Sequence, residues 1–226
     1  MSGYIKALIP HFAAIAVFLL ISSIYYSPSL SGKVLRQSDN IQAKGMQKEI
    51  SELRADNGKH PLWTNSMFGG MPVYQIHLPA GNNIVRYFNK VFLMWGTITS
   101  PVRSMFLLMI MFYILMIAMG VDWRLGIIGA IAYGLATNHI VLTEAGHTTK
   151  IITMAYLPPT LAGILLAFRG KYLVGGILTA LFLSLQVLAN HIQVTYYFFF
   201  ALAILGILEG VKAAKSNQLP QFSTAV

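Results

Sequence analysis

The chain has 226 residues, of which 56% are hydrophobic and only 10% are charged, and its mean hydropathy is +0.63. A soluble domain normally carries about 25% charged residues, so this composition excludes an ordinary soluble protein and indicates a membrane protein. The chain contains no cysteine, which excludes disulfides, thiolate nucleophiles and cysteine-based zinc sites. The net charge of +9 comes from Lys and Arg scattered through loops and span ends, which indicates membrane anchoring and no nucleic-acid partner.

The first apolar stretch, residues 7–26, is long enough to cross a bilayer, which takes about 20 apolar residues. It is longer than the apolar region of a secretory signal, which has about 7 to 15 residues, and an A-x-A-like cleavage site is missing. We therefore expect an uncleaved first span.

Residues 27–103 are mostly polar and predict an extracytoplasmic loop with interfacial helices. Within it, residues 34–54 carry an imperfect apolar stripe at helical spacing and predict a helix. Asn-Gly, Gly-Gly and proline between residues 57 and 72 predict an irregular segment. Residues 87–95 are aromatic and basic, which suits a segment lying among lipid headgroups.

Further apolar segments predict five more spans with very short connectors, at residues 104–120, 123–141, 151–168, 172–189 and 192–207. In the third span Gly126, Ala130 and Gly134 recur every four residues and leave one helix face without bulk, against which a neighbour can pack closely. Pro158 and Pro159 predict a kink in the fourth span. The sequence thus predicts an all-α, polytopic membrane protein in which residues 1–226 form one transmembrane domain of about six helices.

Lys and Arg in the short connectors indicate the orientation. With the N-terminus in the cytoplasm, only Lys150 lies on the outer side, and the inner side carries six such residues: Lys6, Arg124, Arg169, Lys171, Lys212 and Lys215. This orientation places three polar segments on the same outer face: the long first loop, the LTEAGHTTK stretch, and the turn between the last two spans.

Asp39, shortly after the first span, is one of only seven acidic residues in the chain. A carboxylate just outside a membrane can act as a general base on an acceptor hydroxyl, or can bind a divalent cation beside a phosphate leaving group. The alternative is a solvated loop acid or a helix cap.

Glu144, His147 and Lys150 fall within seven residues between two apolar runs. Glu144 and His147 would share a face if this segment were helical, as in Glu-x-x-His metal sites, but the chain has no second such pair. The alternatives are interfacial polar residues or a mutual hydrogen bond. Beside Lys150, His147 is a candidate contact for a phosphate. His191 precedes the aromatic run of the last span, where a turn with an interfacial aromatic belt is the alternative.

Motifs of nucleotide-binding and hydrolytic enzymes, such as the P-loop, G-x-G-x-x-G, G-x-S-x-G and H-E-x-x-H, do not occur. In contrast, the order of RQSDN (36–40), LWTNSMFGGMPVYQ (62–75), EAGHTTK (144–150) and ANHIQVTYYF (189–198) resembles the N-terminal part of bacterial YfhO-type membrane proteins, particularly those of Bacteroidetes. That family belongs with the GT-C glycosyltransferases. The resemblance covers essentially the whole chain, and since family members are several times longer, it implies that these residues correspond to the N-terminal part of such a protein.

The resemblance implies a GT-C-like enzyme of the bacterial cytoplasmic (inner) membrane. It would transfer a sugar from a polyprenyl-phosphate carrier to a cell-envelope glycan, polymer or protein on the extracytoplasmic face, with inversion at the sugar carbon. Asp39 matches the acid of the first loop, which acts as base or as ligand of a divalent cation such as Mg²⁺ or Mn²⁺. His147, Lys150, His191 and Glu144 would bind the substrate. The alternative is a non-enzymatic transporter or envelope-assembly subunit, which prolines in the middle of a span favour.

Overall fold

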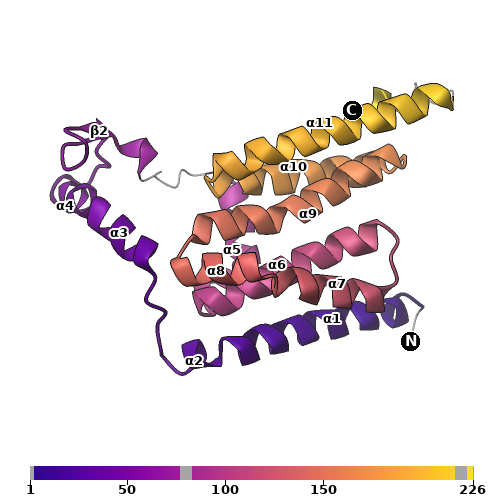
Figure 1. Cartoon of the computed structure of the whole chain (residues 1–226), viewed down its shortest axis with the longest axis horizontal. Coiled ribbons are helices and arrows are strands. Elements are labelled where there is room, and N and C mark those ends of the chain that lie inside the picture. Colours follow the sequence, from indigo (N-terminus) through magenta and orange to yellow (C-terminus); the bar gives the residue numbers. More distant parts are fainter. Residues whose placement is uncertain (1–2, 77–82, 217–222, 226) are drawn as a thin grey trace.

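The computed structural model describes residues 3–76, 83–216 and 223–225, and residues 77–82 of the expected loop lie outside the described part. It shows a bundle of long helices with a small lobe at one end (Figure 1). The elements, in chain order, are α1 (Gly3–Tyr25), α2 (Ser27–Leu30), α3 (Ser38–Met46), α4 (Lys48–Asn57), β1 (Trp63–Thr64), β2 (Met71–Pro72), η1 (Val73–Gln75), α5 (Val85–Phe92), η2 (Met94–Gly96), α6 (Ser100–Ala118), α7 (Trp123–Gly134), α8 (Thr137–Ala145), α9 (Thr148–Phe168), α10 (Tyr172–Leu188) and α11 (Ile192–Lys215).

Four helices in the described part of the chain are long and apolar enough to cross a membrane: α1 from Ile5 onward, α6, α9 and α11. The pair α7–α8 makes a fifth span if the two helices, which meet at a bend of 44°, count as one. The helix α10 is also apolar, but its 17 residues extend only about 25 Å, less than the ~30 Å of a bilayer core. The expectation of a helical, multi-span protein is confirmed, whereas these criteria give four or five spans.

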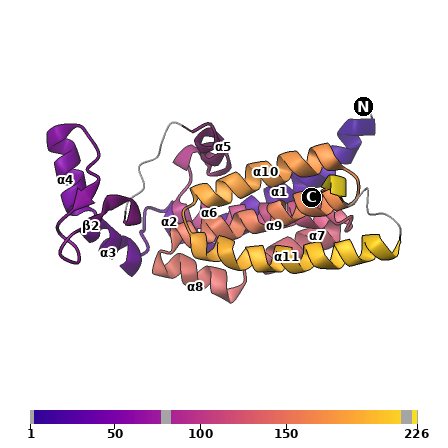
Figure 2. The same cartoon turned by 90° about the horizontal axis from the view of Figure 1, so that it is seen from above.

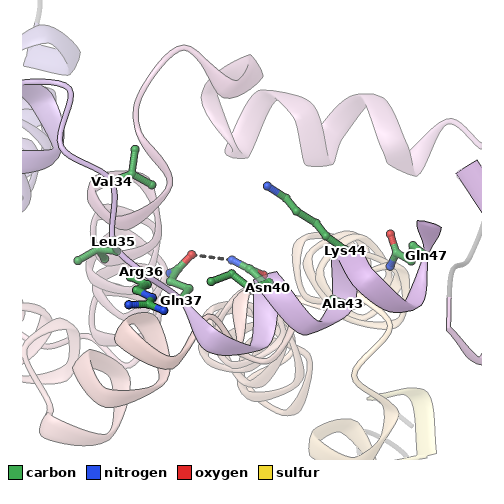
Figure 3. A pocket seen from close by; sticks show the side chains of 9 residues that line it. Val34, Leu35, Arg36, Gln37, Asn40, Ala43, Lys44 and Gln47 are labelled. Carbon is green, nitrogen blue, oxygen red and sulfur yellow. Dashed lines mark hydrogen bonds between the residues drawn. The ribbon is translucent and has the colours of Figure 1, made fainter.

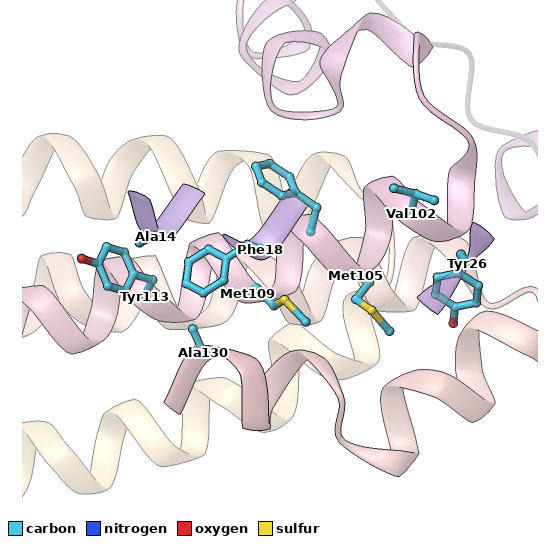
Figure 4. Close-up of a cluster of buried hydrophobic side chains, with 9 residues drawn as sticks. Ala14, Phe18, Tyr26, Val102, Met105, Met109, Tyr113 and Ala130 are labelled. Atoms are coloured by element: carbon cyan, nitrogen blue, oxygen red, sulfur yellow. The ribbon is translucent and has the colours of Figure 1, made fainter. Parts of the chain in front are cut away.

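The helix α6 lies at the centre of the bundle and packs against α1, α7 and α9. On one side its methionines and Tyr113 form a buried apolar cluster with α1 and α7, which Figure 4 shows. The small-residue face of α7 makes this contact: Gly126, Ala130 and Gly134 are all buried, and a methyl group added at Gly134 would lie 2.4 Å from Met109. The close packing expected from the four-residue spacing is confirmed.

The helices α9 and α10 approach each other backbone to backbone at two glycines. A Cβ atom at Gly163 would lie 2.6 Å from the backbone nitrogen of Thr179, and one at Gly175 would lie 2.6 Å from that of Ala167. The two backbones therefore touch, and dispersion between them takes the place of side-chain interlocking.

The expected kink site in α9 lies within one continuous helix, with Pro158 and Pro159 both buried. Pro158 has no N–H to donate to the carbonyl of Met154, one turn earlier. The hydroxyl of Tyr133 in α7 donates to that carbonyl at 3.1 Å instead. A neighbouring helix thus satisfies the backbone group that the proline frees, as the interior of a membrane requires.

The third expected span, residues 123–141, differs from the structure in shape and in its end. It divides into α7 and α8 at Leu135 and Ala136, and α8 continues to Ala145. The buried ring of His139 bridges the break, because its Nδ1 lies 2.7 Å from the carbonyl oxygen of Tyr133. The break removes the α-helical partner of this carbonyl, and the ring of His139 and the N–H of Ala136, at 3.2 Å, take its place.

The polar loop forms the lobe, which consists of α3, α4, β1, β2 and η1. Within it, residues 34–54 are not the single helix that their apolar stripe suggested. Residues 34–37 are extended, and the helical part is split at Gln47 into α3 and α4. A short antiparallel pair of β1 and β2 follows, with Trp63 opposite Pro72. The interfacial segment expected at residues 87–95 becomes α5 and η2, and α5 packs on α10.

The ends of the helices place the polar segments together. The end of α1, the start of α6, the α8–α9 junction and the α10–α11 turn all lie at the end of the bundle that carries the lobe (Figures 1 and 2). The α6–α7 and α9–α10 connections lie at the opposite end. Since every candidate residue named above belongs to the lobe or to a junction at this end, we call it the lobe end.

Candidate functional site

Two of the motifs singled out in the sequence touch each other at the lobe end. Asp39 lies in the first turn of α3, and His147 lies between α8 and α9. The ring nitrogen Nδ1 of His147 lies 3.0 Å from Oδ2 of Asp39, within hydrogen-bonding and ion-pairing distance. The side chains of Asp39 and His147 are 39% and 45% exposed, so both are accessible to a ligand in aqueous solution.

Neighbours of Asp39 fix α3 in this position. The side-chain amide of Gln37 donates to the carbonyl oxygen of Thr143 in α8 at 2.6 Å. The oxygen of the same amide accepts a hydrogen bond of 2.5 Å from Asn40, and Figure 3 shows this pair at the start of α3. The RQSDN segment is therefore held against the EAGHTTK segment by its neutral residues as well as by Asp39.

Gly146 makes this close approach sterically feasible. It closes α8 in the left-handed region with φ of 96°, and the N–H of His147 donates to the Leu142 carbonyl at 3.0 Å, as in glycine-terminated helix ends. A Cβ atom at Gly146 would lie 2.9 Å from Cβ of Gln37. Only glycine provides both the backbone conformation and the space.

The same helix end overturns the idea that Glu144 and His147 share a helix face. Glu144 lies in α8, whereas His147 follows the left-handed Gly146 and precedes α9. Glu144 is exposed and lines a separate pocket of about 480 Å³ with Tyr26 and Lys33, at the α1–α2 turn. The structure thus brings Asp39 and His147 into contact but does not bring Glu144 to them.

Lys150, a cation, and the imidazole of His191 lie beside this contact. Lys150 lies in the first turn of α9, and His191 precedes the first residue of α11 after Asn190, whose φ of 59° makes the tight turn. Burial lowers the pKa of His191, and the positive charges of Lys150 and His147 lower it further. Because two helix N-termini also lie here, their backbone dipoles increase the preference of this location for an anion. We call Asp39, His147, Lys150 and His191 the lobe-end cluster.

A shallow groove of about 570 Å³ runs along α3 next to the cluster. The extended residues before α3 and one face of the helix line it, and Arg36 and Lys44 supply its charge (Figure 3). Neither cation has a carboxylate partner within ion-pairing distance among the described residues. The positive potential of the lobe end therefore extends onto α3.

The described residues contain no group of three or more His, Asp or Glu side chains arranged to hold a metal ion. Asp39 and His147 supply two such side chains. A divalent cation at Asp39 would take its other ligands from water and from a bound phosphate, as Mg²⁺ commonly does.

Sequence reasoning missed Gln37, Asn40 and Gly146, the residues that position the cluster. The signal for Gly146 was present, since a glycine after an apolar helical segment is a typical helix stop. No comparable signal marks Gln37 and Asn40, because neutral amides in a polar loop do not stand out.

The chain matches no family model, no curated protein and no solved structure.

Proposed function

We propose that the protein is a membrane glycosyltransferase, or the N-terminal part of one, that takes a sugar from a polyprenyl-phosphate carrier and transfers it to a cell-envelope acceptor. The observation that carries the proposal is the contact between Asp39 and His147, beside Lys150 and His191 at the end of a membrane bundle. In this proposal α7–α8 and α10 count as spans of a six-helix, GT-C-like domain, and the lobe end faces away from the cytoplasm of a bacterial inner membrane.

The proposed reaction needs a base for the acceptor hydroxyl. As the hydroxyl oxygen attacks the anomeric carbon, the bond from that carbon to the phosphate oxygen breaks, and the electron pair leaves with the carrier phosphate. Asp39 takes the hydroxyl proton. His147 occupies Oδ2 of Asp39, while Oδ1 has only a weak contact of 3.3 Å with the Ser38 hydroxyl. Oδ1 is therefore the atom open to the acceptor.

The leaving phosphate needs positive charge, and the lobe-end cluster provides it. Lys150 supplies a compact cation, and His147 and His191 supply ring N–H donors when oriented or protonated. The pKa of His191, which burial and the neighbouring charges lower, would rise when a phosphate binds, because an anion favours the charged imidazole. Mg²⁺ or Mn²⁺ held by Asp39 would supply further neutralisation of phosphate charge.

Donor binding can be tested with the whole chain in lipid nanodiscs and a photoreactive polyprenyl phosphate. Label is expected in peptides that contain Lys150, and Lys150→Gln should reduce it by about tenfold or more, since one charge-assisted phosphate contact is worth about 1.5–3 kcal/mol. Lys171→Gln is the matched control, because Lys171 also lies at a helix N-terminus but at the opposite end of the bundle. Equal labelling of the Lys150→Gln and Lys171→Gln variants would show that the lobe-end cluster does not bind the carrier phosphate.

The role of Asp39 is separable from donor binding. Asp39→Asn retains the size and the hydrogen-bond acceptor facing His147 but cannot take a proton, so it should keep the cross-link and lose sugar transfer to membrane acceptors. Transfer by Asp39→Asn at the wild-type rate would exclude Asp39 as the base.

The second candidate function is transport of a solute, and the bend between α7 and α8 favours it. Many transporters bind substrate at interrupted helices within the membrane, and the buried His139 lies directly after this break. Solute flux into proteoliposomes, together with no cross-link to polyprenyl phosphate, would support this alternative.

A further inference from the structure

The β1–β2 hairpin of the lobe holds an indole ring in a fixed position. The Nε1–H of Trp63 donates to Oδ1 of Asn65 at 3.2 Å. The ring also lies against Gly70, where an added Cβ atom would be 2.8 Å from Nε1. Trp63 nevertheless stays 52% exposed. A large ring that is both oriented and open to solvent is suited to contact a ligand.

The tip of the hairpin carries backbone strain that its own packing does not explain. Three consecutive residues have positive φ: Phe68 at 52°, Gly69 at 75° and Gly70 at 119°. For a bulky residue this conformation is a genuine outlier, and such strain tends to persist at ligand-binding sites. Phe68 is 89% exposed, so the strained backbone presents its aromatic ring to solvent.

Hydrogen bonds to Glu49 in α4 hold the hairpin in position. The carboxylate of Glu49 accepts hydrogen bonds from the backbone N–H groups of Ser66 (2.9 Å) and Asn65 (3.1 Å) and from the hydroxyl of the buried Thr64. These hydrogen bonds, that of Thr64 first, lower the pKa of Glu49. The turn that bears Trp63 and Asn65 is therefore held in place before any ligand arrives, which limits the entropy lost on binding.

The location of the hairpin excludes the surrounding bilayer as its partner. Figures 1 and 2 both show the hairpin beyond the lobe end, displaced along the direction in which the spans run. A bilayer that encloses α1, α6, α9 and α11 does not reach it. The hairpin therefore lies on the aqueous side, in the same lobe as α3, which carries Asp39.

We propose that the hairpin binds a saccharide chain through an aromatic platform, in which Trp63 and Asn65 form the centre and the exposed rings of Phe68 and Tyr74 in the same segment make further contacts. Its identification as the acceptor site rests on the proposed function. The C–H groups on the flat side of a pyranose ring carry partial positive charge, which matches the negative face of an indole. The Nδ2 group of Asn65 can donate to sugar hydroxyls, while its Oδ1 holds the indole. Tyr74, 61% exposed, adds a third aromatic ring, which carries a hydroxyl.

The experiment measures saccharide binding separately from transfer. The whole chain in nanodiscs is titrated with soluble oligosaccharides of glucose, mannose and N-acetylglucosamine, and binding is followed by isothermal titration calorimetry, which does not depend on Trp63 as a reporter. At least one series should give saturable binding. Trp63→Ala should weaken it at least tenfold, while Trp63→Phe, which keeps an aromatic face, should retain part of it. Trp123→Phe is the control, since Trp123 lies at the opposite end of the bundle.

Gly70→Ala provides a second variant, because the added methyl group, at a backbone φ of 119° that also strains the turn, displaces the indole without removing it. It should weaken binding as Trp63→Ala does, with an unchanged helical circular dichroism spectrum. No saturable binding by the wild type, or equal binding by the wild type and Trp63→Ala, would overturn the platform. Neither result would contradict the proposed binding of the carrier phosphate, which is tested separately by the cross-link at Lys150. Asp39→Asn should bind saccharide normally, so loss of transfer and loss of binding are distinguishable.

Discussion

At the scale of single residues, Gly146 controls whether α3 can reach the junction of α8 and α9. Gly146→Ala places a side chain in the left-handed region and pushes it against Gln37, so we expect a loss of about 1–3 kcal/mol in stability. Gly170→Ala is the matched control, because Gly170 has a φ of 79° but no atom within 4 Å of an added Cβ. Thermal unfolding in detergent should show the larger loss for Gly146→Ala. Equal losses would mean that backbone strain accounts for the whole effect.

The sequence marked the ionisable residues of the site but not the residues that position them. Asp39, His147, Lys150 and His191 were visible because ionisable groups are rare and unfavourable in so apolar a chain. The contact of Asp39 with His147 could not be predicted, since it depends on how a flexible polar loop returns to a helix junction. Glu144 was grouped with His147 by spacing alone, and the intervening glycine separates them.

At the scale of elements, apolar length predicted the spans well and their internal breaks poorly. The helices α1, α6, α9 and α11 follow from runs of apolar residues that only a membrane or a large core can bury. The break between α7 and α8 falls at Leu135 and Ala136, where no proline marks it. The sequence did not predict this break, because the contact that stabilises it comes from the side chain of His139, which lies in the next helix. Residues 34–37 are extended because Gln37 bonds to Thr143 across the junction, a tertiary contact that local propensity does not contain.

The pairing of α9 with α10 depends on the close contact at Gly163 and Gly175. Gly175 and its neighbour Gly176 in α10 allow a matched test of this contact. Gly175→Leu would drive a side chain into the backbone of α9, whereas Gly176 has nothing within 4 Å of an added Cβ. We expect Gly175→Leu to destabilise the bundle by about 3 kcal/mol, the upper part of the usual range for overpacking. Gly176→Leu should have a small effect. Unfolding in detergent, followed by circular dichroism, compares the two variants, and similar midpoints would contradict the close packing.

At the scale of the whole molecule, the orientation of the bundle in the membrane decides whether the lobe-end cluster faces the cytoplasm or the outside of the cell. The basic residues of the short connectors favour a cytoplasmic location for the end that carries Lys171, and this orientation would place the lobe outside. The chain has no cysteine, so single cysteines can report on each end without removing native ones. In intact bacterial cells, a membrane-impermeant maleimide should label Lys59→Cys, in the exposed part of the lobe, without permeabilisation. Lys171→Cys should react only after the membrane is opened. The reverse pattern would place Asp39 and Lys150 in the cytoplasm, and transfer to an acceptor outside the membrane would then be impossible at this site.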